Sequence, residues 1–395
     1  MYRSKQRSQK VIRIATAAYF FVSGFGYTTW ASRIPSIQSH MNLNEAQLGL
    51  ALFALPVGLM VTLPITGGLL NRFSGSRIML FGALFFNITL GLLGYTNSYW
   101  QFLLILFCFG SSRNLLNLSM NTESVGVQAM YKKSIMTTFH AIWSMAGFGG
   151  ALLGYLMVAK HVLPAHHLVG VSVFLITLSL CAVPFLLNQP PVKDTTRAKF
   201  SWPDKTLIKL GFICFSSMAC ENIMYDWSGI YMNKAVHSSH ATATAAFVVF
   251  MTTLTISRFA GDKLVNRYGV KILMQYSGAF IVSGFALAVI FPYIATAVVG
   301  FALVGIGTSC IVPLAFSEAG RSKTMSKGPA IAAVSTVGYL GFLMVPPVVG
   351  FVAQASNLRW SLALIAPLGG VIVWLASRLK SSHEHVDLSA TSIEG

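Results

Sequence analysis

Two ionisable residues of opposite charge, Arg113 and Glu221, each lie within an apolar stretch long enough to cross a bilayer. Counting along a helix from Trp100 places Arg113 about 18 Å deep, and counting from Met232 places Glu221 about 16 Å deep. Charged groups at such depth are costly and therefore mark functional sites. Arginine keeps its proton and suits an anion or a fixed counter-charge. A buried glutamate has its charged form disfavoured, so it can carry a proton.

The two residues allow two interpretations. In the first, they form the core of a transport site, in which Arg113 binds an anionic group and Glu221 exchanges a proton. In the second, they form a structural salt bridge that holds two helices together. The sequence leaves both interpretations open.

Other polar and aromatic residues accompany this pair. Arg113, Asn117 and Asn121 recur every four residues and form a polar stripe on one helix, which can contact hydroxyl-rich cargo or bond to neighbouring helices. His140 can relay protons or can simply be hydrogen-bonded. Asp226 lies nearer the outer surface. The candidate aromatic residues, which can stack on a solute or anchor the chain at the interface, are Trp30, Trp143 and Trp227.

Another group of residues occurs twice at a fixed displacement. Asn71-Arg72-Phe73 returns as Asn266-Arg267-Tyr268, and Glu123 returns as Glu318, in both cases 195 positions later (266 − 71 = 195 and 318 − 123 = 195). This displacement is close to half of the 395 residues. Internal repetition on this scale in an apolar chain is typical of transporters whose halves move against each other.

The composition indicates a lipid bilayer as the surrounding medium. Hydrophobic residues make up 54% of the chain and charged residues 10%, whereas an ordinary soluble domain carries about 25% charged residues. We therefore expect an all-α integral membrane protein. Twelve stretches have the length of a membrane-spanning helix. Their ranges are 11–31, 46–70, 78–95, 101–126, 134–159, 168–187, 207–231, 242–264, 272–291, 294–316, 329–354 and 360–378.

The net charge is +17, and the distribution of the basic residues along the chain predicts the topology. Basic residues concentrate in alternate loops, and the opposite loops hold only Arg33, Lys160, Lys234 and Arg359. This positive-inside bias predicts that both termini are cytoplasmic, and it argues against binding to nucleic acid. The five cysteines lie inside apolar stretches, at no spacing typical of zinc, so we expect no metal and no cofactor.

One long polar connection divides six spans from six. It predicts an N-terminal six-helix half over 1–187, a cytoplasmic linker over 188–206 and a C-terminal six-helix half over 207–380. The polar residues 381–395 are expected to form a disordered cytoplasmic tail.

These features resemble the major facilitator superfamily. The loop signature of that family, roughly G-x-L-a-D-R-x-G-R-R, is similar to residues 67–77, with a shift of one residue before Arg77, and to residues 264–271. The chain departs from the signature at its aspartate, which is Asn71 here and Asn266 in the second copy. The segments that resemble the YbjJ-type bacterial inner-membrane branch are 30–35, 139–144, 226–228 and 338–347.

The resemblance implies two six-helix halves related by pseudo-symmetry. Spans one, four, seven and ten of that fold line a central cavity, so Arg113 and Glu221 could both face it. Repetition and the latch of the family together suggest that Glu123 pairs with Arg72 or Arg77 and that Glu318 pairs with Arg267 or Lys271. Arg258 and Asp262 are four residues apart and are expected to pair on one helix. The expected gating residues are Asn71, Arg72, Arg77, Glu123, Asn266, Arg267, Lys271, Glu318, Arg258 and Asp262.

We therefore expect a secondary transporter that moves a small polar or anionic solute, such as a sugar-like molecule or metabolite, across a bacterial inner membrane. H⁺ is the expected coupling ion, alternating access the expected mechanism, and symport the favoured mode. The alternative is efflux of drugs or metabolites by proton antiport. An enzyme is not expected, since the chain has no H-E-x-x-H, G-x-S-x-G or phosphate-loop motif. The cargo, the direction, Na⁺ as an alternative to H⁺ and the oligomeric state stay open.

Overall fold

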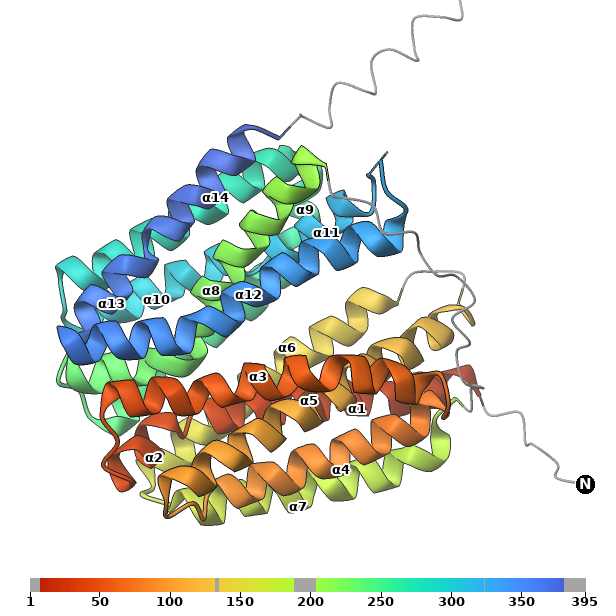
Figure 1. Ribbon diagram of the computed structural model, residues 1–395, viewed down its shortest axis with the longest axis horizontal. Helices are drawn as coiled ribbons and strands as arrows, with labels where there is room; N and C mark the ends of the chain where they lie inside the picture. Colours follow the sequence, from red (N-terminus) through yellow and green to blue (C-terminus); the bar gives the residue numbers. More distant parts are fainter. Residues whose placement is uncertain (1–7, 132–134, 188–203, 323, 380–395) are drawn as a thin grey trace, which may run out of the picture. The chain divides into compact units, whose positions relative to one another are not determined.

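The computed structural model describes residues 8–131, 135–187, 204–322 and 324–379 (Figure 1). Within these ranges the regular structure is helical. The helices of the first half are α1 (Gln9–Ala31), α2 (Ile34–His40), α3 (Glu45–Leu70), α4 (Gly75–Leu93), α5 (Tyr99–Gln128), α6 (Met136–Ala159) and α7 (Pro164–Ala182), which is followed by the 3₁₀ turn Val183–Phe185. Those of the second half are α8 (Lys205–Lys234), α9 (His240–Ile290), α10 (Ile294–Thr308), α11 (Ile311–Ala319), α12 (Lys327–Ala355), α13 (Leu358–Ile365) and α14 (Pro367–Ser377).

The membrane-spanning helices agree with the predicted pattern. In the described part of the chain, eleven helices are long and apolar enough to cross a membrane by length and composition. Helix α1 covers the first predicted range but is not one of these eleven, so its role as a twelfth span stays a prediction. The long helix α9 supplies two of these spans, His240–Gly261 and Lys263–Ile290. Its backbone is non-helical at Gly269, with φ of 77°, a conformation that glycine adopts without strain. Spans seven to twelve are thus built from α8 to α14.

Local sequence explains where several helices begin. Asn44 and Gln47 form a capping box that starts α3, because each side chain bonds to the backbone N–H of the other residue. Asp204 caps α8 by accepting a hydrogen bond from the backbone N–H of Leu207 at 2.8 Å. This bond, with a second one from Thr324, holds the pKa of the Asp204 carboxyl below its ordinary value.

The described residues fall into two compact units, and the same packing pattern occurs in both. One unit holds the residues up to Leu187 with Ser239–Val248, and the other holds residues 204–238 and those from Val249 onward. In the first unit α1 packs against α5, α6 and α7. In the second, α8 packs against α10 and α11, α12 and α14. The first helix of each unit thus contacts the fourth, fifth and sixth spans of its own unit, as the repeat predicts.

The expected domain boundaries are only partly within the described residues. Residues 188–203 of the proposed linker and the tail 381–395 lie outside them. The last residues of the proposed linker are described, and α8 already begins at Lys205. The boundaries of the two halves otherwise stay a prediction.

Glycines allow close helix contacts at equivalent places in the two units. A Cβ on Gly24 or Gly150 would overlap the backbone of the facing helix, at Trp143 and Phe25 respectively, so α1 and α6 touch through their main chains. A Cβ on Gly341 would overlap the backbone of Phe215 in the same way, between α12 and α8. Small residues permit such approach in membranes.

Replacing Gly150 by alanine is expected to lower the stability of the protein by about 1–3 kcal/mol, because the facing backbone at Phe25 cannot move without separating two helices. The change is measured as a fall in the thermal unfolding temperature in detergent. Gly170→Ala is the matched control, since a Cβ there meets nothing within 4 Å. Equal unfolding temperatures for the two variants would contradict the role of Gly150 in packing.

Candidate functional site

Arg113 lies on the face of α5 that meets α1. Its guanidinium carbon is 3.7 Å from the centroid of the Tyr27 ring, a close cation–π contact. The side chain is half-buried. Tyr27 was not among the residues that the sequence singled out, although it lies four residues after Ser23, which also contacts α5.

Ser23 connects the predicted polar stripe to α6. Its hydroxyl donates to Oδ1 of Asn117 at 2.9 Å and accepts from Nε1 of Trp143 at 3.2 Å. Asn121 instead bonds within its own helix, from Nδ2 to the carbonyl of Asn117 at 2.8 Å. The structure therefore brings Asn117 and Trp143 together on one hydroxyl, as expected of interhelical bonding, and both side chains stay partly exposed.

Three other candidates have different surroundings. Trp30 is fully buried and packs against Phe102 and Phe109 of α5, and Trp227 is fully buried in the second unit. Neither ring is exposed in this structure, and the role of these two tryptophans in lining a cavity stays a prediction. Asp226 is also buried, and its Oδ2 accepts a hydrogen bond from Asn222 at 3.0 Å.

His140 has an exposed side chain on α6. Its ring makes an edge contact with Phe20, with centroids 5.6 Å apart. A role in relaying protons stays a prediction.

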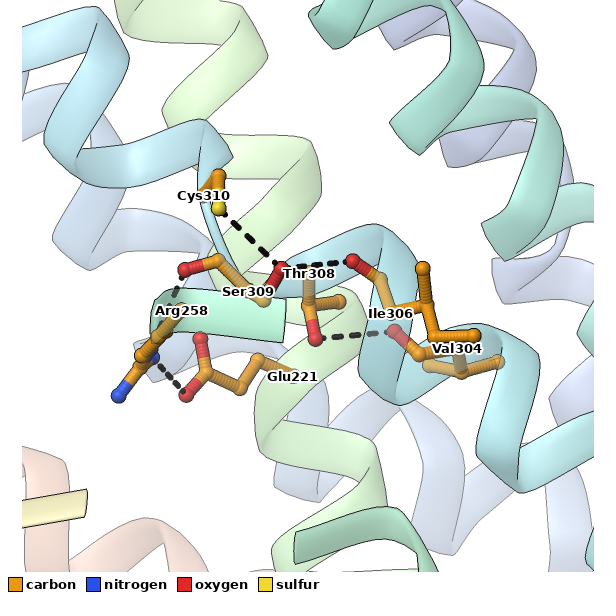
Figure 2. A network of polar contacts seen from close by, with 7 residues as sticks. All are labelled: Glu221, Arg258, Val304, Ile306, Thr308, Ser309 and Cys310. Carbon is orange, nitrogen blue, oxygen red and sulfur yellow. Dashed lines mark hydrogen bonds and ion pairs between the residues drawn. The ribbon is translucent and has the colours of Figure 1, made fainter. Parts of the chain in front are cut away.

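The second unit holds an ion pair near the middle of α8. Nη2 of Arg258, on α9, is 3.1 Å from Oε1 of Glu221. Nε of Arg258 donates to the backbone carbonyl of Ser309 at 3.1 Å. Figure 2 shows these groups together, with Arg258 between Glu221 and the end of α10. The expected pairing of Arg258 with Asp262 cannot be followed, since the Asp262 side chain lies outside the described residues.

A break in the tenth span explains why Ser309 offers its carbonyl. Helix α10 ends at Thr308 and α11 begins at Ile311. Pro313 has no N–H, so it cannot donate to the carbonyl four residues before it, which is that of Ser309 (313 − 4 = 309). Arg258 uses this acceptor. Next to it, the Cys310 thiol contacts the carbonyl of Ser257 at 3.6 Å, so α9 bonds to the break at two successive residues.

The break distinguishes the two units. The residues 195 positions before Thr308 and Ser309 are Arg113 and Asn114, and they lie inside the continuous helix α5. Asn114 donates from Nδ2 to Oγ1 of Thr66 at 3.0 Å. The first unit therefore has a cation, Arg113, on the helix itself. The second unit has a helix break at the equivalent position, and Arg258 of α9 supplies the cation there.

Glu123 occupies an interior position near the end of α5. Its side chain is 1% exposed, and neither carboxylate oxygen has a side-chain hydrogen-bond partner among the described residues, although the backbone N–H of Leu187 lies near it. The expected ion pair with Arg72 or Arg77 is thus absent there, since both arginines are exposed. The reason is packing: α5 continues to Gln128 and carries Glu123 beneath the first turn of α4, where a Cβ on Gly75 would lie 3.1 Å from Oε2. The N-terminal end of a helix favours an adjacent carboxylate.

Glu318 has a different partner from the two that were expected. Its Oε1 is 3.0 Å from Nη1 of Arg321, three residues later in the turn after α11. This local pair forms because both side chains leave the same face of one helical turn. The other expected gating residues, Asn71, Asn266, Arg267 and Lys271, lie at or near the surface, and Arg267 lies over the Tyr268 ring at 5.2 Å.

Sequence reasoning missed a buried pair in the first unit. Nε of Arg33, which precedes α2, donates to Nδ1 of His167 in α7 at 2.9 Å. Arg33 is 2% exposed and His167 is 4% exposed. The positive-inside pattern treated Arg33 as a loop charge, and no signal in the sequence pairs it with His167.

Comparison with known proteins agrees with the fold and the repeated packing. The Major Facilitator Superfamily profile matches residues 16–322 and 210–392. An uncharacterized MFS-type transporter of Yersinia pestis is 29% identical over 357 residues, which cover 90% of this chain and 92% of that protein. The cis,cis-muconate transport protein of Acinetobacter baylyi is 22% identical over 91% of this chain and 92% of its own length.

Solved structures share the architecture. A crystal structure of a mutant of the nucleoside transporter NupG superposes with a TM-score of 0.73 and 15% identity, covering 93% of this chain and 99% of that chain. At that identity the likeness shows the fold alone. The profile match, the eleven candidate spans of the described residues and the two similarly packed units lead to one assignment: the chain belongs to the major facilitator superfamily and is a multi-pass membrane transporter rather than an enzyme.

Proposed function

We propose that this protein is a proton-coupled secondary transporter for a small polar or anionic organic solute, and that Glu221 takes up and releases the proton. The observation that carries the proposal is the Glu221–Arg258 pair beside the break between α10 and α11. A carboxylate within the membrane is costly unless a cation or a proton compensates its charge. The charge of Glu221 is compensated by Arg258 at 3.1 Å. When Glu221 takes up a proton, the proton neutralises the carboxylate in place of Arg258.

The place of this pair suits a coupling role. Arg258 connects α8 and α9 with the interrupted tenth span. A change in the charge of Glu221 therefore alters the contact between Glu221 and Arg258, which lies beside the break in the tenth span. Broken helices are common at transporter binding sites. A ligand or proton shifts a conformational equilibrium only through such differential contacts.

One relative supports the class of solute. By its name it is a cis,cis-muconate transport protein, and cis,cis-muconate is an organic anion. We extend to this chain the coarser property, a small polar or anionic cargo. Efflux by proton antiport remains the second candidate, since the same carboxylate would serve it.

The test is solute flux in liposomes that contain the purified protein, with an imposed pH gradient and a panel of organic anions, nucleosides and sugars. We expect gradient-dependent movement of at least one member, abolished when an ionophore collapses the gradient. No gradient-dependent movement across the panel, from protein shown to be folded, would remove the proton-coupled proposal.

We further propose that Glu123 takes part in a gate at the cytoplasmic side, where the basic loops and both termini are expected. A buried carboxylate without a side-chain hydrogen-bond partner among the described residues is costly, and movement of α4 that brings in Arg72 or Arg77 would give it a charged partner. The repeat places Glu318 at the equivalent position of the second unit.

Glu123→Gln is expected to change the ratio of inward-open to outward-open protein several-fold, equivalent to about 1 kcal/mol. The ratio is measured from distances between spin labels at Phe73 and Tyr268, both of which are exposed. Glu45→Gln, in the first turn of α3, is the matched control and should leave the distances unchanged. The same distance distribution in all three proteins would exclude Glu123 from the gate.

A further inference from the structure

We propose that Arg33 and His167 bind a small monovalent anion, of the size of chloride, inside the first unit between the α1–α2 turn and the start of α7. This site is separate from the Glu221–Arg258 pair, and it does not depend on the proposed function. Two observations support it: a pair of buried hydrogen-bond donors, and a buried cation beside a neutral partner.

The first observation concerns hydrogen bonds. Nδ1 of His167 accepts from Nε of Arg33 at 2.9 Å, so the ring proton lies on Nε2. Nε2 of His167 and Nη2 of Arg33 are therefore both donors, and neither has a hydrogen-bond partner among the described residues. The two donors belong to side chains that are bonded to each other. Because buried N–H groups almost always bond to an acceptor, the pair is complementary to a ligand that accepts hydrogen bonds.

The second observation concerns charge. Arg33 is buried, a guanidinium keeps its proton, and the histidine ring that it contacts is neutral. No carboxylate within the described ranges pairs with Arg33, because the ion pairs found there involve Arg258 and Arg321. A buried charge is costly unless an opposite charge compensates it. The site therefore favours a ligand that is negatively charged.

An anion suits these donors better than a water molecule does. A water that accepts from both N–H groups still has two hydrogens of its own that require acceptors, and it carries no charge. An anion accepts both bonds and also compensates the guanidinium. The neighbours of the pair, Ser32, Ile34 and Leu168, are themselves buried, so the enclosed site selects a small anion.

The fold holds the α1–α2 turn in place. Ser32 packs directly on α6, since a Cβ on Gly154 would overlap its side chain. The hydroxyl of Ser32 donates to the carbonyl of Thr29 at 2.7 Å, so it is bonded within its own turn. Helix α1 also packs against α7. An anion bound by Arg33 and His167 would therefore strengthen the contact between the first and sixth spans.

The experiment compares the thermal unfolding temperature of the purified protein in potassium chloride and in potassium gluconate, both at an ionic strength of about 0.1 M. Gluconate is too large for an enclosed site. We expect chloride to raise the unfolding temperature of wild type by about 2 °C, because a ligand that binds only the folded protein stabilises it. Bromide should act as chloride does. Equal unfolding temperatures in chloride and gluconate would overturn the inference.

Two variants test the location of the ion. Replacing Arg33 and His167 together by leucine removes the charge and both donors, so the effect of chloride should disappear. His166→Leu, at an exposed neighbouring position, is the matched control and should keep the effect. An effect of wild-type size in the double variant would show that chloride acts elsewhere, and it would overturn the site.

A measurement on wild type keeps the proposal testable even if the double variant fails to fold. Crystals of wild type grown in bromide should show the anomalous signal of one bromide beside Nη2 of Arg33 and Nε2 of His167. Crystals that diffract well but show no such signal there would overturn the inference.

Discussion

Glutamine at position 221 is expected to abolish proton-driven accumulation of solute in proteoliposomes while solute exchange continues. A transporter that moves one proton per solute can sustain about tenfold accumulation for each unit of pH gradient, because a tenfold ratio corresponds to about 1.4 kcal/mol. Glutamine has nearly the same size and can accept a hydrogen bond from Arg258, but it cannot exchange a proton. The accumulation ratio should therefore fall to about 1, with the solute identified by the flux panel as the probe.

The same measurement distinguishes this role from a structural salt bridge. If Glu221 only holds α8 to α9, glutamine should lower exchange, accumulation and the unfolding temperature together. If it carries the proton, accumulation is lost while exchange is retained. Glu45→Gln controls for loss of a carboxylate elsewhere. Accumulation at the wild-type ratio in Glu221→Gln would show that another group carries the proton.

The sequence predicts the fold well because hydropathy reports helix length directly. The twelve ranges correspond to α1, α3 to α7 and the spans built from α8 to α14. Even the division of α9 is predicted, since Gly269 lies between two expected spans. The repeat at 195 residues identifies equivalent positions, and the structure gives the two units the same internal packing.

Contacts between helices were harder to predict. Spacing along one helix predicts that Arg258 pairs with Asp262, and this prediction stays untested because the Asp262 side chain lies outside the described residues. The bond of Arg258 to Glu221 joins residues 37 positions apart on two helices, so no spacing rule along one helix predicts it. The sequence also predicts how deep a residue lies along its helix, but it does not predict which face of the helix the residue occupies. Trp30 and Trp227 are buried. The sequence did not predict this burial, because helices that are apolar on all sides carry no periodic signal of which face is inside.

The helix break at Ser309 had a partial signal. Pro313 indicates that some carbonyl in the tenth span lacks its helical donor. The residue that supplies the replacement donor depends on which helix packs there, and this is a property of the tertiary structure. The sequence therefore predicts the unbonded carbonyl near Pro313, and only the fold shows that Arg258 is its donor.

Replacing His167 by leucine is expected to destabilise the protein by about 3 kcal/mol, since it leaves the buried Arg33 without its acceptor. Burial lowers the pKa of Arg33 to about 10, so the guanidinium is still charged at neutral pH. Nδ1 of His167 accepts the Arg33 hydrogen bond, so the ring proton lies on Nε2 and the imidazole is neutral. Leucine has a similar volume but cannot accept, and the apparent unfolding temperature should fall by several degrees.

A neighbouring histidine and a double variant provide the controls. His166 is exposed on the same turn of α7, so His166→Leu should change the unfolding temperature little. Replacing Arg33 and His167 together by leucine removes the buried charge as well as its acceptor, and we expect it to recover part of the loss. Simple additivity of the two single changes would contradict direct coupling, because residues that share a buried hydrogen bond are expected to show an interaction energy. Recovery would mean that the charge of Arg33, rather than the shape of His167, determines the cost of breaking the pair.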